Sequence, residues 1–203
     1  EFRRVALPIL QEEFGEARCF DTPLSEGGIM GAAIGMALYG LRPVPEIQFG
    51  DFIFPAYDQI VSELAKMRYR SGGEYSSKMV IRTPVGGGIR GGLYHSQNVE
   101  AIMSHLPGVR VVYPAFADDA AGLLRTSMRS QGLTFFLEPK FLYNRPEAKS
   151  PKGSDKFAVP FGKGRVRRSG TDLSVITYGN TVHMALRVAD QPAAESASAP
   201  RLP

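Results

Sequence analysis

Cysteine is almost absent from this sequence, and its scarcity excludes the sites that depend on it. Cys19 is the only cysteine in 203 residues, so the chain can form neither an internal disulfide nor a cysteine-rich metal site. The three histidines, His95, His105 and His183, lack the spacing that puts two metal ligands on one face of a helix, so a zinc site is not expected. A lone cysteine is also typical of a reducing compartment.

Charge of one sign and long apolar runs are scarce as well. The net charge is only +4, and the basic clusters at residues 66–70 and 163–168 are interpreted as solvated faces or helix ends, because nucleic-acid-binding proteins concentrate more charge. The longest apolar run, residues 29–39, is too short to cross a bilayer, and the first four residues do not resemble a secretory signal. We therefore expect a soluble intracellular protein that binds neither nucleic acid nor membrane.

Short β-rich runs alternate with helical patterns along the chain. The apolar runs at residues 79–81 and 109–112 are nearly continuous, as buried parallel strands require. This alternation predicts an α/β fold with a mostly parallel sheet and helices on both faces. The expected strands are Val44–Phe49, Met79–Thr83, Val109–Tyr113 and Thr134–Leu137, and the expected helices are Phe54–Arg70, Ser96–His105 and Ala117–Arg129.

The texture of the sequence changes near Pro139. Residues 1–143 are expected to form one domain that is incomplete at its N-terminus, and residues 144–170, rich in Pro, Lys, Gly and Arg, a linker. Residues 171–190 begin a new strand–turn–helix unit that stops before a second strand. The small, polar residues of the tail, 191–203, predict disorder.

Glu26 is the only carboxylate at the start of a helix of small and apolar side chains. An acid is favoured there by the helix dipole, whatever its function. The helix also carries Gly31 and Gly35, which allow another backbone or a flat ligand to approach closely. A carboxyl at the edge of such an apolar wall can share a proton with a ring nitrogen.

The glycine-rich stretch VGGGIRGGLYHSQ follows an expected strand. Its glycines satisfy G-x-G-x-x-G, but no helix opens at the last one, so dinucleotide binding is not the favoured interpretation. We interpret the stretch as a mobile loop that delivers His95, whose imidazole is suited to carrying protons. Ser96 is interpreted as the cap of the next helix. Phe49, Phe52 and Phe54 crowd a strand end, where an exposed ring can stack on a heteroaromatic ligand.

Three stretches carry a resemblance to a known family: TPLSEGGIMGAAIGMALYGLRPVPEIQF, DFIFPAYDQIVSELAKMRYRSGG and GGLYHSQNVEAIMSHLPGVRVVYPAFADDAAGLL. Over residues 12–189 the chain resembles the β subunit of the E1 component of thiamine-diphosphate-dependent 2-oxo acid dehydrogenases, especially the branched-chain (2-oxoisovalerate) type. The resemblance implies a transketolase-like pyrimidine-binding domain and the start of a transketolase C-terminal domain. In that family E1 decarboxylates a 2-oxo acid and passes the acyl group to the lipoyl group of E2.

The resemblance also implies roles for four residues. Glu26 matches the acid that hydrogen-bonds N1′ of the aminopyrimidine and so promotes proton removal from thiazolium C2. Phe52 matches the aromatic ring that stacks on the pyrimidine, and Leu24 joins them as a cofactor-binding residue. His95 matches the loop histidine implicated in proton handling and in acyl transfer to lipoamide. Glu26 and His95 are therefore the expected catalytic residues.

An α subunit is the expected partner, in a heterotetramer of two α and two β chains. In the family it supplies the Gly-Asp-Gly…Asn motif that holds Mg²⁺ and the diphosphate, and this chain has no such motif. Family members often bind a structural potassium ion near the helix end that corresponds to residues 127–132. The acid and the proline expected there are missing, and we leave the ion unassigned. The compartment would be the cytosol in bacteria and the mitochondrial matrix in eukaryotes.

Three alternatives remain open at this stage. The chain resembles the pyruvate and acetoin dehydrogenase β subunits of the same fold, whose substrate pocket is also shared with an α chain. A truncated chain could bind α without catalysing a reaction. A nucleotide-binding regulator is the remaining alternative.

Overall fold

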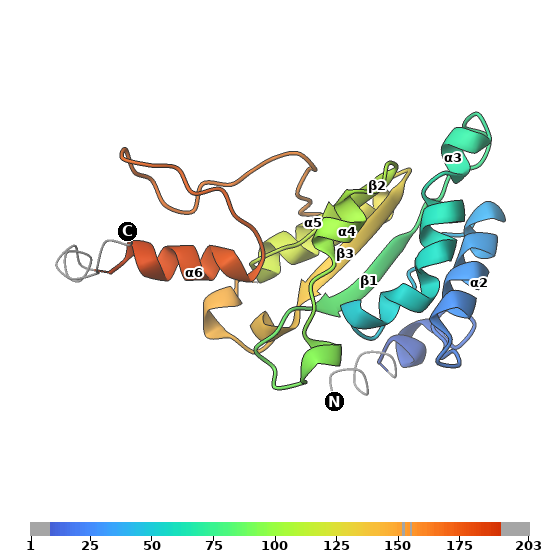
Figure 1. Cartoon of the computed structure of the whole chain (residues 1–203), viewed down its shortest axis with the longest axis horizontal. Coiled ribbons are helices and arrows are strands. Elements are labelled where there is room, and N and C mark those ends of the chain that lie inside the picture. The colour runs from blue at the N-terminus through green and yellow to red at the C-terminus, as the bar shows by residue number, and fades with distance from the viewer. Residues whose placement is uncertain (1–8, 152, 155, 192–203) are drawn as a thin grey trace.

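A three-stranded parallel sheet forms the centre of the chain in a computed structural model that describes residues 9–151, 153–154 and 156–191 (Figure 1). The strands are β1 (Val80–Val85), β2 (Val109–Val112) and β3 (Leu133–Pro139), in the order β1-β3-β2. Val80 pairs with Thr134 and Val109 with Leu133, both in parallel. The predicted parallel α/β sheet is confirmed.

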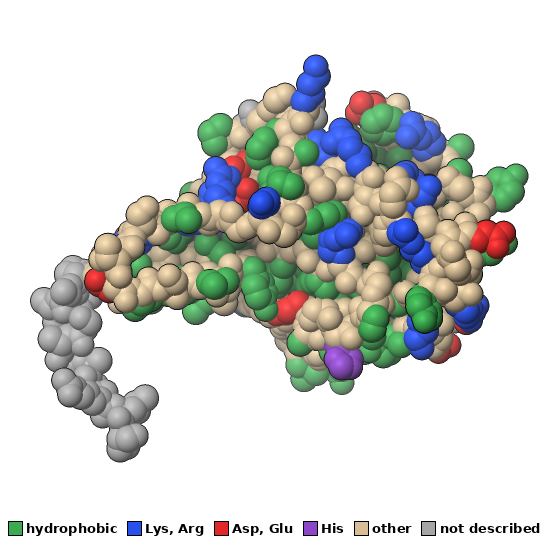
Figure 2. Space-filling model, turned by 90° about the horizontal axis from the view of Figure 1, so that it is seen from above, with side chains coloured by type: hydrophobic (Ala, Val, Ile, Leu, Met, Phe, Trp, Pro, Cys, Tyr) green, Lys and Arg blue, Asp and Glu red, His purple; other side chains and the backbone are tan. Residues whose placement is uncertain are grey.

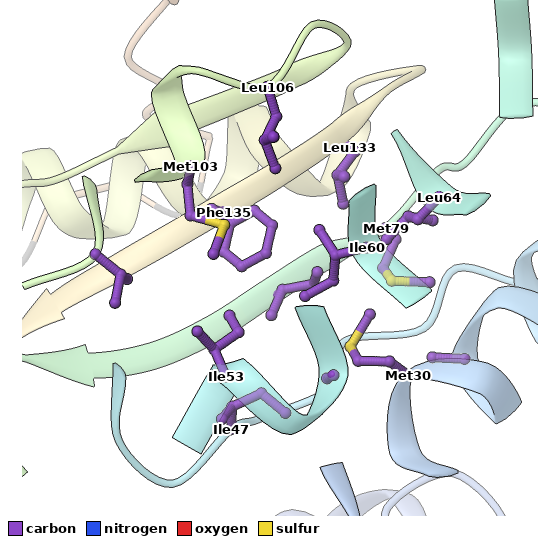
Figure 3. Packing of buried hydrophobic residues seen from close by; sticks show 14 of the residues in the cluster. Met30, Ile47, Ile53, Ile60, Leu64, Met79, Met103, Leu106, Leu133 and Phe135 are labelled. Carbon is purple, nitrogen blue, oxygen red and sulfur yellow. The ribbon is translucent and has the colours of Figure 1, made fainter. Parts of the chain in front are cut away.

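Helices cover both faces of this sheet. One face packs on α2 (Glu26–Leu38), on the helical segment after residue 50 and on α4 (Glu100–Ser104), and Phe135 of β3 lies fully buried between them (Figure 3). The other face, with Val80 and Phe136, packs on α5 (Ala117–Arg129). Side chains of a strand alternate between the faces, so β3 contributes to both cores.

The strand expected at Val44–Phe49 is reduced to a single parallel bridge between Glu46 and Arg82. The carbonyls of Pro43 and Pro45 accept hydrogen bonds from the N–H groups of Val80 and Arg82, at 3.4 and 3.0 Å. Ile47 N–H donates in return to Arg82 O at 2.9 Å and completes this bridge, but Pro45 has no N–H to donate beside Val80, so the pairing extends no further. The prediction had the right position beside β1 but the wrong structure.

The helix expected over Phe54–Arg70 is three pieces rather than one. A 3₁₀ segment, η1 (Gly50–Ala56), precedes a π-helical segment, η2 (Gln59–Leu64), and a short α3 (Met67–Arg70). The wide turn is visible in the bond from Ala65 N–H to Ile60 O, 2.9 Å long. The apolar side chains of this segment nevertheless face the core, where Ile60 and Leu64 are buried.

The chain beyond β3 is mostly irregular. It contains η4 (Lys140–Leu142), η5 (Pro146–Ala148) and a final helix, α6 (Asn180–Ala189). The linker contacts α5, where Arg165 pairs with Asp118 and Asp119, both at 3.0 Å.

The unit expected over residues 171–190 is formed only in part. The helix is present, but residues 171–178 form no paired strand within the described chain, and Ile176 is 98% exposed. A strand needs a neighbour for its backbone groups, and none of the described strands lies beside it. His183 Nε2 lies 2.7 Å from the carbonyl oxygen of Ala115 and so attaches α6 to the segment between β2 and α5. The assignment to a C-terminal domain stays a prediction, and the tail expected to be disordered lies, from residue 192 on, outside the described residues.

Among the described residues, no helix is both long and apolar enough to cross a membrane. Lys and Arg side chains are scattered over the face in Figure 2 rather than gathered in one patch.

A matched pair of isoleucines tests the position of the core. Ile60 is 0% exposed and Ile176 is 98% exposed. We expect Ile60→Ala to lower the free energy of unfolding by about 2–5 kcal/mol, because it removes buried methyl groups and leaves a cavity. Ile176→Ala should change it by less than about 0.5 kcal/mol. Urea unfolding measures both, and equal effects would contradict this packing.

Candidate active site

The carboxyl ends of the three parallel strands meet at one edge of the sheet, where α/β proteins commonly bind ligands. Gly86 follows β1, Tyr113 follows β2 and Lys140 follows β3. The histidine loop, residues 86–97, starts at this edge. Its base is closed by a 3.0 Å hydrogen bond from Gly86 N–H to Gln97 O.

The structure brings Phe52 and His95 together, as two of the expected site residues. Their ring centroids are 5.5 Å apart in an edge-on arrangement. Phe49 completes the group, 4.5 Å from His95 and 5.5 Å from Phe52. Lys140 Nζ lies 4.1 Å from the centre of the Phe49 ring, so a cation borders the cluster. The histidine is half-buried against two aromatic rings.

The histidine loop is not the start of a helix. Leu93–His95 form a single 3₁₀ turn, and α4 begins only at Glu100. The predicted cap role of Ser96 is wrong: its hydroxyl donates to Gly92 O at 2.6 Å, inside the loop, and Val99 precedes the helix. The helix is accordingly shorter than the expected residues 96–105.

Glu26 is the first residue of α2 and is half-buried. Its carboxylate has no hydrogen bond or ion pair with any residue that the structure describes. The start of α2 lies against η1, because a Cβ at Gly27 would stand 3.3 Å from Pro55 O. Glu26 is thus held beside the segment that presents Phe52, with its acceptor oxygens unused.

Helix α2 is buried on one face only. Met30 and Ile34 lie in the core, whereas a Cβ at Gly31 or at Gly35 would meet nothing within 4 Å. Leu24, before the helix, is 81% exposed. Among the described residues, nothing covers the small-residue face of α2, which is therefore open.

These residues suit an aminopyrimidine ring. Such a ring needs a carboxyl oxygen at a ring nitrogen and an apolar face to stack on. The Glu26 carboxylate has no partner among the described residues, and Phe49 and Phe52 provide aromatic surface nearby. No cluster of three or more His, Cys, Asp or Glu side chains suited to a metal ion occurs in the described part of the chain. Within the described residues, this arrangement has the side-chain types that an aminopyrimidine ring needs and lacks a cluster of side chains suited to a divalent metal.

A cation already lies at the helix end considered for potassium. Arg42 Nη1 donates to the carbonyl oxygens of Met128 and Ser130, at 2.9 and 3.0 Å, where α5 ends. A guanidinium there is favoured by the helix dipole. A hollow of about 280 Å³ lies nearby, at the opposite edge of the sheet from His95, and none of the expected site residues lines it. Potassium remains unassigned.

A partly buried polar network lies near the carboxyl ends of β1 and β3. Arg82 Nε donates to Glu138 Oε1 at 2.6 Å, and the Tyr143 hydroxyl donates to the other oxygen of Glu138. Burial raises the pKa of Tyr143 well above its ordinary value, and the charge of Glu138 raises it further. Burial alone would lower the pKa of Arg82, but Glu138 and then Glu46 outweigh it, so the guanidinium stays charged.

Sequence reasoning missed Asp51 and Lys140 in this region. Lys140 is 45 residues from His95, and Asp51 lies in Gly50-Asp51-Phe52, which does not match the Gly-Asp-Gly motif. No local sequence pattern predicts that Asp51 or Lys140 lies here, because both contact this region from distant parts of the chain. The one sequence signal for this region was the group of aromatic residues around Phe49, which predicted that the segment lies at a strand end where a ligand could bind.

The sequence matches the family described as the transketolase pyrimidine-binding domain over residues 7–146. The chain belongs to this family. A solved structure titled a split-gene transketolase, an inactive β4 tetramer, has the same fold, with a TM-score of 0.69, 22% identity, and 95% of this chain and 59% of that chain covered. The predicted transketolase-like fold is confirmed.

Its relatives narrow the resemblance to 2-oxo acid dehydrogenase β subunits. The chain is 48% identical over 182 residues to the 2-oxoisovalerate dehydrogenase subunit beta of Bacillus subtilis, covering 90% of this chain and 55% of the relative. The counterpart in Pseudomonas aeruginosa is 44% identical, with 90% and 56% covered. The pyruvate dehydrogenase E1 component subunit beta of Bacillus subtilis is also 44% identical, with 90% and 55% covered. The chain spans about half the length of these curated relatives.

The raised pKa of Tyr143 predicts a loss of stability at high pH. The folded chain keeps the phenolic proton while the unfolded chain releases it above its ordinary pKa of about 10. The unfolded state then binds fewer protons, and the free energy of unfolding falls as pH rises. We expect this fall between about pH 9 and about pH 11 to be smaller in Tyr143→Phe than in wild type. Denaturant unfolding across this range measures it, and identical slopes would contradict the network.

Proposed function

We propose that this chain is part of the β subunit of a 2-oxo acid dehydrogenase E1 component and works with thiamine diphosphate. The observation that carries the proposal is the unused carboxylate of Glu26, held beside the segment that presents Phe52 to His95. The 44–48% identity to named β subunits supports it. Thiamine diphosphate, when bound, supplies the carbon nucleophile that decarboxylates a 2-oxo acid.

Each side chain has a separate task in this proposal. The Glu26 carboxyl holds a proton at N1′ of the aminopyrimidine, and Phe52 provides the face on which this ring stacks. Leu24 contributes apolar surface beside Glu26. His95, on a loop and half-buried between rings, donates or accepts a proton during transfer of the acyl group to a lipoyl group.

The proposed partner is an E1 α subunit that brings the metal and diphosphate site. The described part of this chain has no metal-binding cluster, and the open face of α2, with Gly31 and Gly35, leaves room for the close approach of another backbone. Exposed Leu24 and Tyr39 lie at the two ends of this helix. A lipoyl-bearing E2 is the proposed acceptor of the acyl group.

A branched-chain 2-oxo acid is the proposed substrate. Of the two relatives from Bacillus subtilis, the 2-oxoisovalerate dehydrogenase subunit is 48% identical and the pyruvate dehydrogenase subunit 44%. Pyruvate is therefore the second candidate.

Glu26→Gln tests the proposed chemistry. In an enzyme reconstituted with an α subunit, we expect it to lower kcat by about 10²–10⁴-fold, because an amide cannot exchange a proton with the ring nitrogen. Glu74→Gln, which changes an exposed glutamate in the turn after α3, is the matched control and should leave kcat unchanged. Circular dichroism verifies that both variants fold. Wild-type turnover by a folded Glu26→Gln would remove Glu26 from the proposed site.

A substrate panel tests the proposed specificity. The reconstituted wild-type enzyme is assayed with 2-oxoisovalerate and with pyruvate, at equal concentrations, for reductive acylation of lipoamide. We expect a kcat/KM at least about tenfold higher for the branched-chain acid, since a filled apolar pocket discriminates by about this factor. A preference for pyruvate would reverse the assignment of substrate without changing the reaction.

A further inference from the structure

One short segment makes three separate contacts with the histidine loop. Phe49 and Phe52 place their rings against His95, with centroids 4.5 and 5.5 Å away. Between them, Asp51 turns its carboxylate to the loop base, where Oδ2 accepts a hydrogen bond from Gln97 N–H at 3.3 Å. The two rings contact the imidazole, and the carboxylate contacts the backbone that carries it.

The contact made by Asp51 lies where the loop closes. Gln97 O accepts from Gly86 N–H at 3.0 Å, so both backbone groups of Gln97 are bound. The neighbour of Asp51, Gly50, lies tightly against the same place, since a Cβ there would stand 3.0 Å from Val85 Cγ1 and 3.5 Å from Gln97 O. The start of η1 therefore packs against the base of the loop with no room for a side chain at Gly50.

Four residues of the histidine loop have a positive φ. Gly86, Gly88 and Gly92 have φ between +69° and +87°, and Arg90 has φ of 60°, which is unfavourable for a residue with a side chain. Glycine residues can adopt many backbone conformations, so the loop does not have one preferred shape on account of its sequence. Ring contacts with His95 are apolar and weakly directional, so they do not by themselves set where the loop begins and ends.

One of the two carboxylate oxygens of Asp51 makes no hydrogen bond with any described residue. This oxygen, Oδ1, is buried. A buried unpaired acceptor is costly, so an apolar residue would serve better if Asp51 merely filled space.

We propose that Asp51 is a positioning residue: its carboxylate fixes Gln97 at the base of the histidine loop and thereby sets the place of His95 against Phe49 and Phe52. Its effect on catalysis rests on the proposed function, whereas its effect on the loop does not. Asp51 acts through the backbone and touches neither substrate nor cofactor.

Hydrogen exchange and NMR of the full chain test this directly. In Asp51→Ala we expect the Gln97 amide to exchange about tenfold faster or more, because it loses a hydrogen bond to a charged acceptor. The His95 ring signals should move toward those of an unstructured histidine. Exchange at Phe135, in the centre of β3, should not change. Asp51→Asn, whose amide oxygen is a weaker acceptor, should give an intermediate rate at Gln97.

Asp58→Ala is the matched control. Its carboxylate accepts from Ser62 Oγ at 2.8 Å in the same helical stretch, so the variant removes one charge and one hydrogen bond away from the loop. It should leave Gln97 and His95 as in wild type. Unchanged exchange at Gln97 in Asp51→Ala, or equal acceleration at Phe135, would overturn the proposal. If Asp51→Ala does not fold, Asp51→Asn decides by the same two amides.

The assembled enzyme separates this proposal from the proposed function. Asp51→Ala should lower kcat for acylation of lipoamide by about 10–10²-fold with the KM for the 2-oxo acid little changed, because a misplaced proton carrier slows the reaction without weakening substrate binding. A wild-type kcat in this variant would overturn the positioning role. If the wild-type assembly itself has no thiamine-diphosphate-dependent turnover, the proposed function fails, and the exchange data still decide the role of Asp51 in the loop.

Discussion

The parallel pairing of β3 with both of its neighbours is the constraint on which the rest of the structure depends. Because β3 lies in the middle, its side chains supply both cores, with Phe135 on one face and Phe136 on the other. Parallel pairing also puts all three carboxyl ends at one edge. The histidine loop, Tyr113 and Lys140 meet at that edge only because the strands run in the same direction, so the site is a consequence of sheet topology.

The elements predicted well are those decided by burial periodicity. Residues 117–129 have a clear polar and an apolar face, and α5 has the expected bounds. The errors arose where backbone hydrogen bonding, rather than side-chain burial, decides. Pro45 cannot donate to a ladder, which reduced an apolar run to a bridge, and the extra residue in the turn between Ile60 and Ala65 does not alter which side chains face the core. The pattern of hydrophobic residues predicts neither a missing backbone N–H nor a π-helical turn.

The candidate site was predictable as a set of residues but not as a set of contacts. Glu26, Phe52 and His95 were identified by resemblance, and the ring contact between the last two is present. The partners of the loop were not predictable, because Asp51 and Gln97 are 46 residues apart and nothing in either local sequence specifies the other. The position of Glu26 beside η1 likewise depends on how closely Gly27 can approach Pro55.

The closure of the histidine loop at Gly86 and Gln97 has a consequence for how the family can diversify. The two ends of the loop are held together by the sheet edge and by η1, independently of the residues between them. Insertions or exchanges among residues 87–96 therefore leave β1 and α4 where they are, and each extra residue adds only a small closure entropy. The scaffold can therefore accept a different loop, with different side chains at the carboxyl edge of the sheet, without a change in its core.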